Sequence, residues 1–395
     1  MNEILYSKLL QESDNKKEFA KQFTKRRYLY QEINKIKSKY HIGVYGLRGI
    51  GKTIMLLQLS LEHKDSIYFS ADATYLTGIK LYEIVNFLEK KGHKMIYVDE
   101  IAHKDNWKID LKTISDENKV IIYFTSSSAI DIQTGVDLSR RVLLFELKAA
   151  SFREYLNILK NKNLDKIDLK DLLNINKRKE ILKSHRVYNE YFEEYLKFGG
   201  FLYRTSPDLQ EFYLSLDNVT KKIIYADLGI LKSLNPKIEE DAKNILILLA
   251  TTAPFETSYT KVSNNMINIS KNTVISLIGD LEKTGLIKQL KSCNSGYALI
   301  RTESKIFLNL PFRYFFNYTM GKTPNIGSLR EDFFVYSASP DCYVKTGKAK
   351  SADFMINNKL YEIGGESKKN NQNADYLVVD SLACENNKIP LFLFG

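Results

Sequence analysis

Residues 46–53, GLRGIGKT, constrain this chain more than any other part of its sequence. They fit the pattern G-x-x-x-x-G-K-[ST] and lie between an apolar run, HIGVY, and a segment of helical character, KTIMLLQLSLEH. A glycine-rich turn between a strand and a helix directs backbone N–H groups inward, at the positive end of the helix dipole. Such a turn binds phosphate groups, so the stretch predicts a phosphate-binding loop.

The residue types of this loop indicate a bound nucleotide and a metal ion. Lys52 supplies a cation for the outer phosphates, and the hydroxyl of Thr53 is an oxygen ligand of the kind that Mg²⁺ prefers. The sequence therefore predicts ATP and Mg²⁺ as cofactors. The residues predicted to contact ATP are Gly46, Arg48, Gly49, Ile50, Gly51, Lys52, Thr53 and Ile54.

A second apolar run, KMIYV at residues 94–98, ends in Asp99 and Glu100. A carboxylate at the tip of a buried strand is suited to hold the metal ion, and its neighbour to polarise the attacking water. We assign Asp99 to the metal and Glu100 as general base, and expect both to face the loop from the adjoining strand. The run at 120–125 leads into Ser126 and Ser127; Thr125 or either serine is a candidate sensor of the γ-phosphate, and we select Ser127.

An arginine often counters the transition-state charge in enzymes with this loop, in cis or from a neighbouring subunit. Arg140 and Arg141 precede the fifth apolar run, and Arg48 lies within the loop. A structural salt bridge is an equal alternative for each. We assign Arg141 as the catalytic arginine; action in trans would imply a homo-oligomer.

The apolar runs at 41–45, 66–70, 94–98, 120–125 and 141–147 alternate with segments of helical pattern. They lack polar alternation, as do strands buried on both faces of a parallel sheet. The chain is therefore predicted to have an α/β fold built on a parallel sheet. The predicted organisation is an N-terminal helical segment (1–40), a P-loop core (41–149), a helical lid (150–235), a winged helix-turn-helix (236–320) and a small α/β domain (321–395). The wing is predicted from the runs LIKQL and YALIRT, joined by KSCNSG.

The net charge of +11 fits a nucleic-acid partner, although the Lys, Asn, Ile and Tyr bias of the chain would produce a similar charge without one. Residues 16–40 form a basic amphipathic helix candidate, in which Arg26 and Arg27 contact phosphates or belong to a solvated face. No apolar stretch reaches the ~20 residues of a membrane span, and no signal-peptide run begins the chain. We expect no membrane partner and a cytoplasmic protein, with its three cysteines reduced.

The motifs together resemble the archaeal-type AAA-related ATPases of bacteria and archaea. The loop GLRGIGKT matches theirs with Leu47 in place of a proline, and FTSSS matches with Ser126 in place of a glycine. In LSRRVLLFELKAASFREYL, Arg141 takes the family's arginine and Arg140 replaces a glycine, while LKFGGF resembles the lid motif without its proline. The resemblance implies an ATPase core of the AAA-like P-loop class, a lid, a winged helix and a C-terminal restriction-endonuclease-like domain.

A working endonuclease of that class would need a metal-binding acid followed by E-x-K. Glu331, Asp353 and Glu362 stand where the acids belong, but Gly364 replaces the lysine and Lys368 would have to swing back. We therefore expect an inactive domain, retained for partner docking or for stability.

The helix at 271–284 is expected to present four residues outward: Lys271, Asn272, Ile275 and Ser276. Side chains of this kind at the start of such a helix reach DNA, although the set is only mildly basic. The leading hypothesis is a Mg²⁺-dependent ATPase that remodels DNA or a DNA-bound complex. The alternatives are a nucleotide-controlled switch that docks a partner protein through its C-terminal half and, third, an ATP-dependent nuclease.

Overall fold

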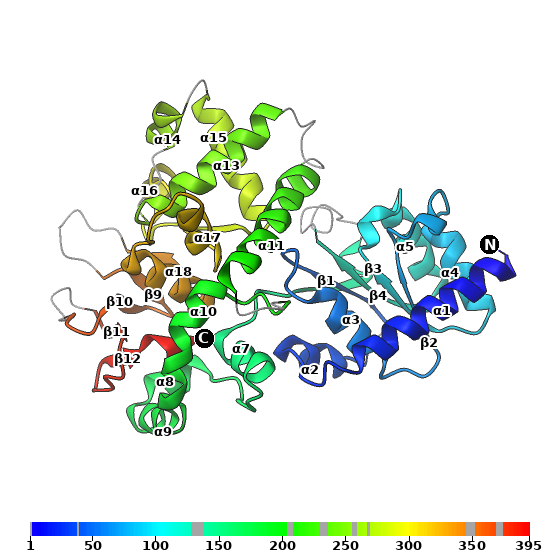
Figure 1. Cartoon of the computed structure of the whole chain (residues 1–395), viewed down its shortest axis with the longest axis horizontal. Coiled ribbons are helices and arrows are strands. Elements are labelled where there is room, and N and C mark those ends of the chain that lie inside the picture. Colours follow the sequence, from blue (N-terminus) through cyan, green and yellow to red (C-terminus); the bar gives the residue numbers. More distant parts are fainter. Residues whose placement is uncertain are drawn as a thin grey trace. The chain divides into compact units, whose positions relative to one another are not determined.

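The computed structural model describes residues 2–37, 39–127, 138–203, 208–228, 236–254, 259–266, 269–344, 352–368 and 374–395. These residues form two compact units, Met1–Lys148 and Ala149–Gly395 (Figure 1). Among the described residues, none of the helices combines the length and the apolar composition that a membrane span requires.

The first unit is built on a parallel sheet. Its strands are β1 (His41–Tyr45), β2 (Ser66–Ser70), β3 (Met95–Asp99), β4 (Ile121–Ser126) and β5 (Val142–Glu146). They are the five apolar runs of the sequence, and the prediction of a parallel α/β sheet is confirmed. Their order is β2-β3-β4-β1-β5, so β4 lies between β1 and β3. The expectation that Asp99 and Glu100 come from the strand adjoining β1 was therefore wrong, because the chain inserts β4 between them.

Alternate side chains of these strands enter two layers. Phe69 and Val98 share a core with α4 (Leu81–Lys90) and α5 (Trp107–Glu117). Tyr97, one position from Val98, points to the other face and donates its hydroxyl to the carbonyl of Leu59 at 3.1 Å. Leu59 belongs to α3 (Lys52–Ser60), so helices cover both faces and the strands need no polar side.

Helix α1 (Glu3–Ala20) lies along β2, an edge strand of the sheet (Figure 1). Ser13 Oγ accepts from the backbone N–H of Tyr68 at 3.0 Å, and Lys17 donates to the carbonyl of Ser66 at 2.6 Å. These side chains satisfy edge-strand groups that would otherwise be open to pairing with another chain. The predicted single basic helix over residues 16–40 is wrong, since α1 ends at Ala20 and α2 covers Tyr28–Asn34.

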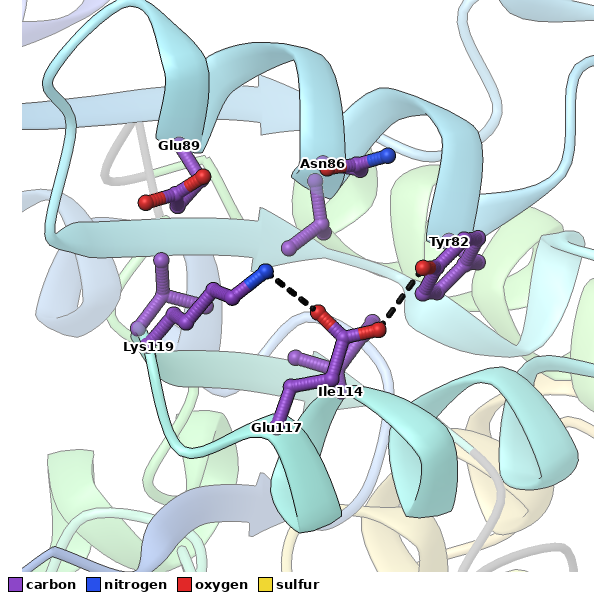
Figure 2. A pocket seen from close by; sticks show the side chains of 8 residues that line it. Tyr82, Asn86, Glu89, Ile114, Glu117 and Lys119 are labelled. Atoms are coloured by element: carbon purple, nitrogen blue, oxygen red, sulfur yellow. Dashed lines mark hydrogen bonds and ion pairs between the residues drawn. The ribbon is translucent and has the colours of Figure 1, made fainter.

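A groove between α4 and α5 encloses about 10 Å³. Figure 2 shows Glu117 bridging its two sides: it accepts from the Tyr82 hydroxyl at 2.7 Å and meets the Lys119 ammonium at 3.1 Å. A space of that size holds at most one water molecule. The groove is therefore not a binding site for a nucleotide.

The second unit contains many short helices and two sheets. The helices include α7 (Phe152–Leu159), α8 (Leu169–Leu173), α9 (Ile175–His185), α10 (Phe192–Phe198), α11 (Leu209–Lys222), α13 (Pro236–Thr251), α14 (Tyr259–Asn265), α15 (Lys271–Lys283), α16 (Gly296–Arg301), α17 (Phe312–Thr319) and α18 (Ile326–Ala338). The strands are β6 (Ile287–Leu290), β7 (Lys305–Leu308), β8 (Cys342–Tyr343), β9 (Phe354–Ile356), β10 (Lys359–Gly365), β11 (Tyr376–Asp380) and β12 (Lys388–Pro390).

The C-terminal sheet has the order β12-β11-β10-β9-β8. Strands β10, β11 and β12 are parallel, whereas β9 is antiparallel to β10 and to β8. Phe152 and Phe192 from the helices after Ala149 share one core with Phe307 of β7, Phe333 of α18 and Phe354 of β9. The segments predicted as a lid, a winged helix and a terminal domain are thus held together by common apolar side chains.

The predicted strand YALIRT (297–302) is wrong, because its residues form α16 and end just beyond it. The partner of β6 is β7, with Ile287 opposite Leu308 in an antiparallel register. Ala and Leu in the YALIRT stretch favour a helix, whereas KIFL at 305–308 has the branched and aromatic character of a strand.

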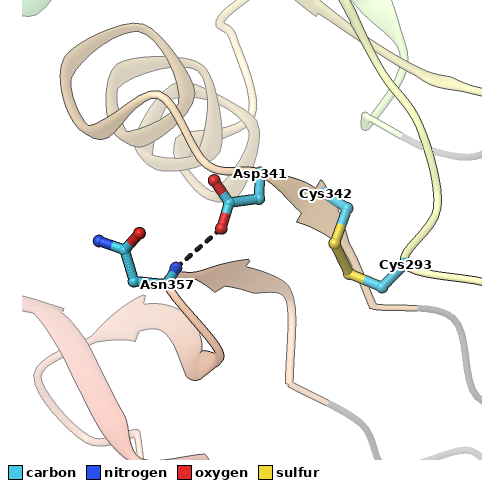
Figure 3. The surroundings of a disulfide bond; sticks show 4 residues. All are labelled: Cys293, Asp341, Cys342 and Asn357. Carbon is cyan, nitrogen blue, oxygen red and sulfur yellow. Dashed lines mark hydrogen bonds between the residues drawn. A yellow bond between two sulfur atoms is a disulfide. The ribbon is translucent and has the colours of Figure 1, made fainter.

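A disulfide joins Cys293 and Cys342, with their Cα atoms 5.0 Å apart (Figure 3). The expectation of three reduced cysteines is therefore corrected. The two residues are 49 positions apart in sequence, and backbone pairing brings them together, since the N–H of Cys293 donates to the carbonyl of Tyr343 at 2.8 Å. Figure 3 also shows Asp341 accepting from the backbone N–H of Asn357 at 2.7 Å, beside the disulfide.

Candidate functional site: a phosphate-binding loop and an acidic pair

The glycine-rich loop connects the end of β1 to the start of α3. Gly51 precedes α3 with φ 97°, a left-handed conformation that glycine adopts without strain. A Cβ atom on Gly46 would lie 2.2 Å from the carbonyl oxygen of Leu147, so no larger residue fits there. Since the first N–H groups of a helix have no partner within it, those of α3 are directed to the loop and can receive an anion.

Lys52 is buried within this loop, at 5% exposure. Its ammonium donates to the carbonyl oxygens of Gly46 at 2.9 Å and Leu47 at 3.1 Å. The loop therefore encloses a cation beside the amino end of a helix. Both features suit a phosphate chain, and the residues present fit a nucleotide.

Asp99, at the end of β3, receives hydrogen bonds from three hydroxyl groups. Thr53 donates to Oδ2 at 2.8 Å, Tyr68 donates to the same oxygen at 3.1 Å, and Thr125 donates to Oδ1. The structure thus brings together Thr53 and Asp99, the two residues that the sequence assigns to the metal. Burial raises the pKa of Asp99, and the hydroxyls of Thr125, Thr53 and Tyr68 oppose that rise.

Glu100 is held by Ser127, which follows β4. The Ser127 hydroxyl donates to Oε1 at 2.5 Å and its backbone N–H donates to Oε2 at 3.1 Å. Burial by itself would raise the pKa of Glu100, but Lys52, Ser127 and Arg48 outweigh it and hold that pKa below its ordinary value. Glu100 is therefore an ionised carboxylate at neutral pH, as a general base must be.

Two further residues contribute to this site: Thr125, which the sequence offered as a candidate sensor but did not select, and Tyr68, which the sequence analysis did not name. Thr125 donates to Asp99 and also accepts from the backbone N–H of Glu100 at 2.9 Å, so it links the two acids. Tyr68 of β2 reaches Asp99 across the sheet. The signal for Tyr68 in the sequence was a phenol inside an apolar strand. The sheet register places it opposite Tyr97, two positions before Asp99.

The remaining predicted residues lie at different distances from these acids. Arg48 lies in the loop and is near enough to Glu100 to lower its pKa. Gly49 has a positive φ of 81°, Ile50 is fully buried, and Ile54 lies in the first turn of α3.

Arg141 lies at the amino ends of the sheet strands, opposite to the ends that face the loop. The register pairs His41 with Val142 and Tyr45 with Glu146, so Arg141 is level with the amino end of β1, whereas the loop follows its carboxyl end. Arg141 also donates to Asp116 Oδ1 at 2.9 and 2.8 Å. The assignment of Arg141 as a catalytic arginine acting in cis is therefore wrong. A contribution in trans remains a prediction.

The C-terminal acids form a second group. Glu362 lies in β10 and is fully buried, and the backbone N–H of Ile363 donates to Asp353 Oδ2 at 2.7 Å. The pKa of Glu331 is raised to about 7, mainly by burial; the charge of Lys305 opposes the rise and that of Asp353 adds to it. The structure thus brings Glu331, Asp353 and Glu362 to one region. Among the described residues, however, no group of three His, Cys, Asp or Glu side chains is arranged to hold a metal ion.

Lys368 does swing back toward this group. Its ammonium lies 2.7 Å from Glu362 Oε1, and its Cγ lies 2.6 Å from where a Cβ of Gly364 would stand. The stem of Lys368 therefore occupies the space that a side chain at position 364 would need.

Helix α15 presents the four predicted residues Lys271, Asn272, Ile275 and Ser276 to solvent. Its opposite face is buried through Val274, Leu277, Ile278 and Leu281. Helix α15 therefore has one exposed and one buried face.

The strand order, the phosphate-binding loop and the acidic pair define an AAA-like α/β domain of the P-loop ATPase class. In agreement, a family model described as an AAA domain matches residues 38–156. The uncharacterized protein MJ1637 of Methanocaldococcus jannaschii is 31% identical over 319 residues, which are 74% of this chain and 67% of that protein. The chain belongs to the same family as this archaeal protein.

Solved structures show weaker similarity. The Walker-type ATPase PABY2304 of Pyrococcus abyssi is 12% identical, with 73% of this chain and 93% of that chain covered and a TM-score of 0.44. AMPPCP-bound DnaA from Aquifex aeolicus is 20% identical, with 65% and 87% covered and a TM-score of 0.27. Likeness at this level supports no statement about the function of this chain.

Proposed function

We propose that this protein is a Mg²⁺-dependent ATPase whose hydrolysis is coupled to remodelling DNA or a DNA-bound complex. The observation that carries the proposal is the hydrogen bond of Thr53 to Asp99 at 2.8 Å, at the start of a helix whose preceding loop encloses the ammonium of Lys52. A hydroxyl and a carboxylate side by side are the protein ligands that Mg²⁺ takes at a nucleotide's phosphates.

Each residue of the site has a separate task in this proposal. The backbone of residues 46–53 holds the phosphates, Lys52 neutralises their charge, and Thr53 with Asp99 holds the metal ion. A bound Mg²⁺ supplies charge stabilisation for the transferred phosphoryl group. Glu100 accepts the proton of the attacking water, and Ser127 fixes the orientation of the Glu100 carboxylate through two hydrogen bonds.

The proposed DNA coupling rests on the second unit. Helices α13, α14 and α15 are followed by the antiparallel β6–β7 pair, with α16 inserted between the two strands, and this order supports a variant of the winged helix-turn-helix as the proposed DNA-binding element. The exposed Lys271 and Asn272 stand at the start of α15, where such helices meet DNA. The net charge of +11 favours attraction to the phosphate backbone. For the C-terminal sheet we propose a supporting or docking role without nuclease activity.

The decisive experiment measures the ATPase rate with and without duplex, forked and single-stranded DNA. Stimulation that weakens as salt rises is the expected result. A rate that no DNA form changes, together with no salt-sensitive DNA binding, would contradict the coupling and favour a nucleotide-controlled switch that docks a partner protein.

Two variants test the ATP site itself. Lys52→Ala is expected to abolish ATP binding, because the cation of the loop is lost. Glu100→Gln is expected to keep ATP binding and to stop turnover, because an amide cannot accept the proton. Equal loss of binding in both variants would show that Glu100 is not the base.

A further inference from the structure

Arg27 is a buried arginine that contacts the back of the phosphate-binding loop. It precedes α2 and is 5% exposed. One guanidinium nitrogen donates to the carbonyl of Ile50 at 3.0 Å, and another donates to the carbonyl of Lys148 at 2.8 Å. The sequence offered a phosphate contact or a solvated face for this residue, and the structure shows neither.

The bond to Ile50 fixes a peptide plane that matters for phosphate binding. In a trans peptide the carbonyl of one residue and the N–H of the next point in opposite directions. When Arg27 holds the Ile50 carbonyl on one side, the N–H of Gly51 is directed to the other side. Gly51 immediately precedes α3, so its N–H is among the groups that face the loop interior.

The bond to Lys148 fixes the other part of the loop. Leu147, the preceding residue, donates its N–H to the Tyr45 carbonyl at 2.8 Å, and its own carbonyl abuts Gly46. Arg27 therefore links two parts of the chain: residues 147–148, which lie against Gly46, and the peptide between Ile50 and Gly51.

The chain around Arg27 is itself fastened along α3. The side-chain amide of Gln58 donates to the carbonyls of Phe23 at 2.7 Å and Lys25 at 3.0 Å. Beyond the far end of α3, Glu62 accepts from two side chains of the same segment: the Tyr30 hydroxyl at 2.5 Å and the Arg26 guanidinium at 2.8 Å. The segment that carries Arg27 is thus held in place by these hydrogen bonds, and so is the guanidinium of Arg27.

We infer that Arg27 is a positioning residue of the ATP site: it orients the phosphate-binding loop before the nucleotide arrives, without touching the nucleotide. The inference rests on the proposed ATP binding. Arg27 lies outside residues 38–156, the part matched by the AAA domain model. Its physical basis is preorganisation, because a loop that is already in the binding conformation loses less freedom when the ligand binds.

The test compares the full chain with Arg27→Met, Arg27→Lys and the control Arg26→Met. Arg26 is adjacent and also charged, but it binds Glu62 away from the loop. Four quantities are measured: the dissociation constant for ATP with Mg²⁺ by calorimetry, KM, kcat, and the hydrogen-exchange rates of the amides of residues 46–52.

Arg27→Met is expected to raise the dissociation constant and KM about tenfold or more, with kcat within about threefold of wild type. The amides of the loop should exchange faster, while those of β3 keep their protection. Arg27→Lys should show an intermediate loss, since one ammonium cannot reproduce the fork of a guanidinium. Arg26→Met should stay within about twofold of wild type.

Wild-type affinity and wild-type loop exchange in Arg27→Met would overturn the inference. So would an equal loss in KM and kcat accompanied by faster exchange throughout the first unit, which would mark a general structural role. If Arg27→Met does not fold, Arg27→Lys decides by the same criteria. If the wild-type chain binds no ATP, the proposed function fails, and the exchange of the loop amides alone then decides the role of Arg27.

Discussion

Asp99 and Glu362 are two buried carboxylates on parallel strands of two different sheets, and they have different partners. Asp99 ends β3 at 5% exposure and accepts from the hydroxyls of Thr53, Tyr68 and Thr125. Glu362 lies within β10, is fully buried, and has an ammonium, that of Lys368, 2.7 Å away.

This difference separates a site prepared for a cation from one that already contains its cation. Hydroxyl groups hydrogen-bond to a buried carboxylate without bringing an opposite charge, so Asp99 can still take a metal ion as its cation. Lys368 compensates the charge of Glu362 from within the same chain. The position of an acid on a strand therefore does not decide its role, whereas the chemistry of its partners does.

The largest effect is expected when the charge of Asp99 is removed. Asp99→Asn keeps the shape of the side chain but loses the anion that holds the metal. Turnover should fall a hundredfold or more, because the loss of the metal ion removes roughly several kcal/mol of transition-state stabilisation. The folded state should be no less stable, because a buried charge has been deleted. Steady-state ATPase assays and thermal unfolding check both expectations.

Glu362→Gln is the matched control for that experiment. It makes the same kind of change at the other carboxylate, and ATPase turnover should stay within about twofold of wild type, since no catalytic role is assigned to this residue. A large loss of turnover in Glu362→Gln would remove the distinction between the two sites.

The second effect is a loss of stability in Lys368→Met. This change leaves Glu362 buried without its cation, which costs about 3 kcal/mol, the low end of the range for broken buried pairs, because Lys368 is still 36% exposed. Urea unfolding measures the loss, and the double variant with Glu362→Gln should recover most of it. If the single variant is as stable as wild type, the pair is not a stabilising one.

A separate assay tests the C-terminal site for catalysis. Mg²⁺- or Mn²⁺-dependent DNA cleavage that disappears in Glu362→Ala would show that this site is an active nuclease.

The third effect depends on pH through Glu331. Burial raises the pKa of this carboxyl from 4.5 to about 7 in the folded chain. The folded state therefore holds a proton that the unfolded state has lost, and the stability from this group is complete below pH 4.5 and lost as the pH rises to about 7. The charged neighbours that contribute to the shift are Lys305, Asp353, Asp332 and Arg313.

Glu331→Gln should remove this dependence. At pH 8 the variant should be more stable than wild type by about 2 kcal/mol, allowing for partial contact with solvent, and the difference should vanish near pH 4. Denaturant unfolding at a series of pH values provides the measurement. A constant difference across the series would show that Glu331 has an ordinary pKa.

The sequence predicted the parallel sheet and most residues of the phosphate-binding loop because those features are local. A glycine pattern, an apolar run and a pair of acids each lie within a few consecutive residues. Strand order is not local, and for that reason the insertion of β4 between β1 and β3 was missed. The same insertion carries Thr125 to Asp99, so the missed strand order also explains why Thr125 was considered only as a γ-phosphate sensor and not as a partner of Asp99.

Contacts between distant segments account for the other differences. Arg313 and Asp332 form a fully buried ion pair, and Arg313 also donates to the carbonyl of Leu249 at 2.8 Å. Nothing in the spacing of these residues indicates that they meet. Arg27 likewise looked like a surface cation, because its partners are backbone carbonyls that carry no sequence signal.

The smallest effect concerns the disulfide, and it separates the two regions by chemistry. All three cysteines lie beyond residue 148, so reduction cannot act directly on the unit that contains Asp99. Reduction of Cys293–Cys342 should lower the stability of the second unit by about 1 kcal/mol. That is less than chain entropy suggests for a separation of 49 residues, because backbone pairing at Tyr343 keeps the segments together. ATPase turnover should not change.

Thiol titration of the unfolded chain without reductant should count one free thiol, that of Cys384. A count of three would show that the disulfide does not form in solution, and a loss of turnover on reduction would show that the two units do not act independently.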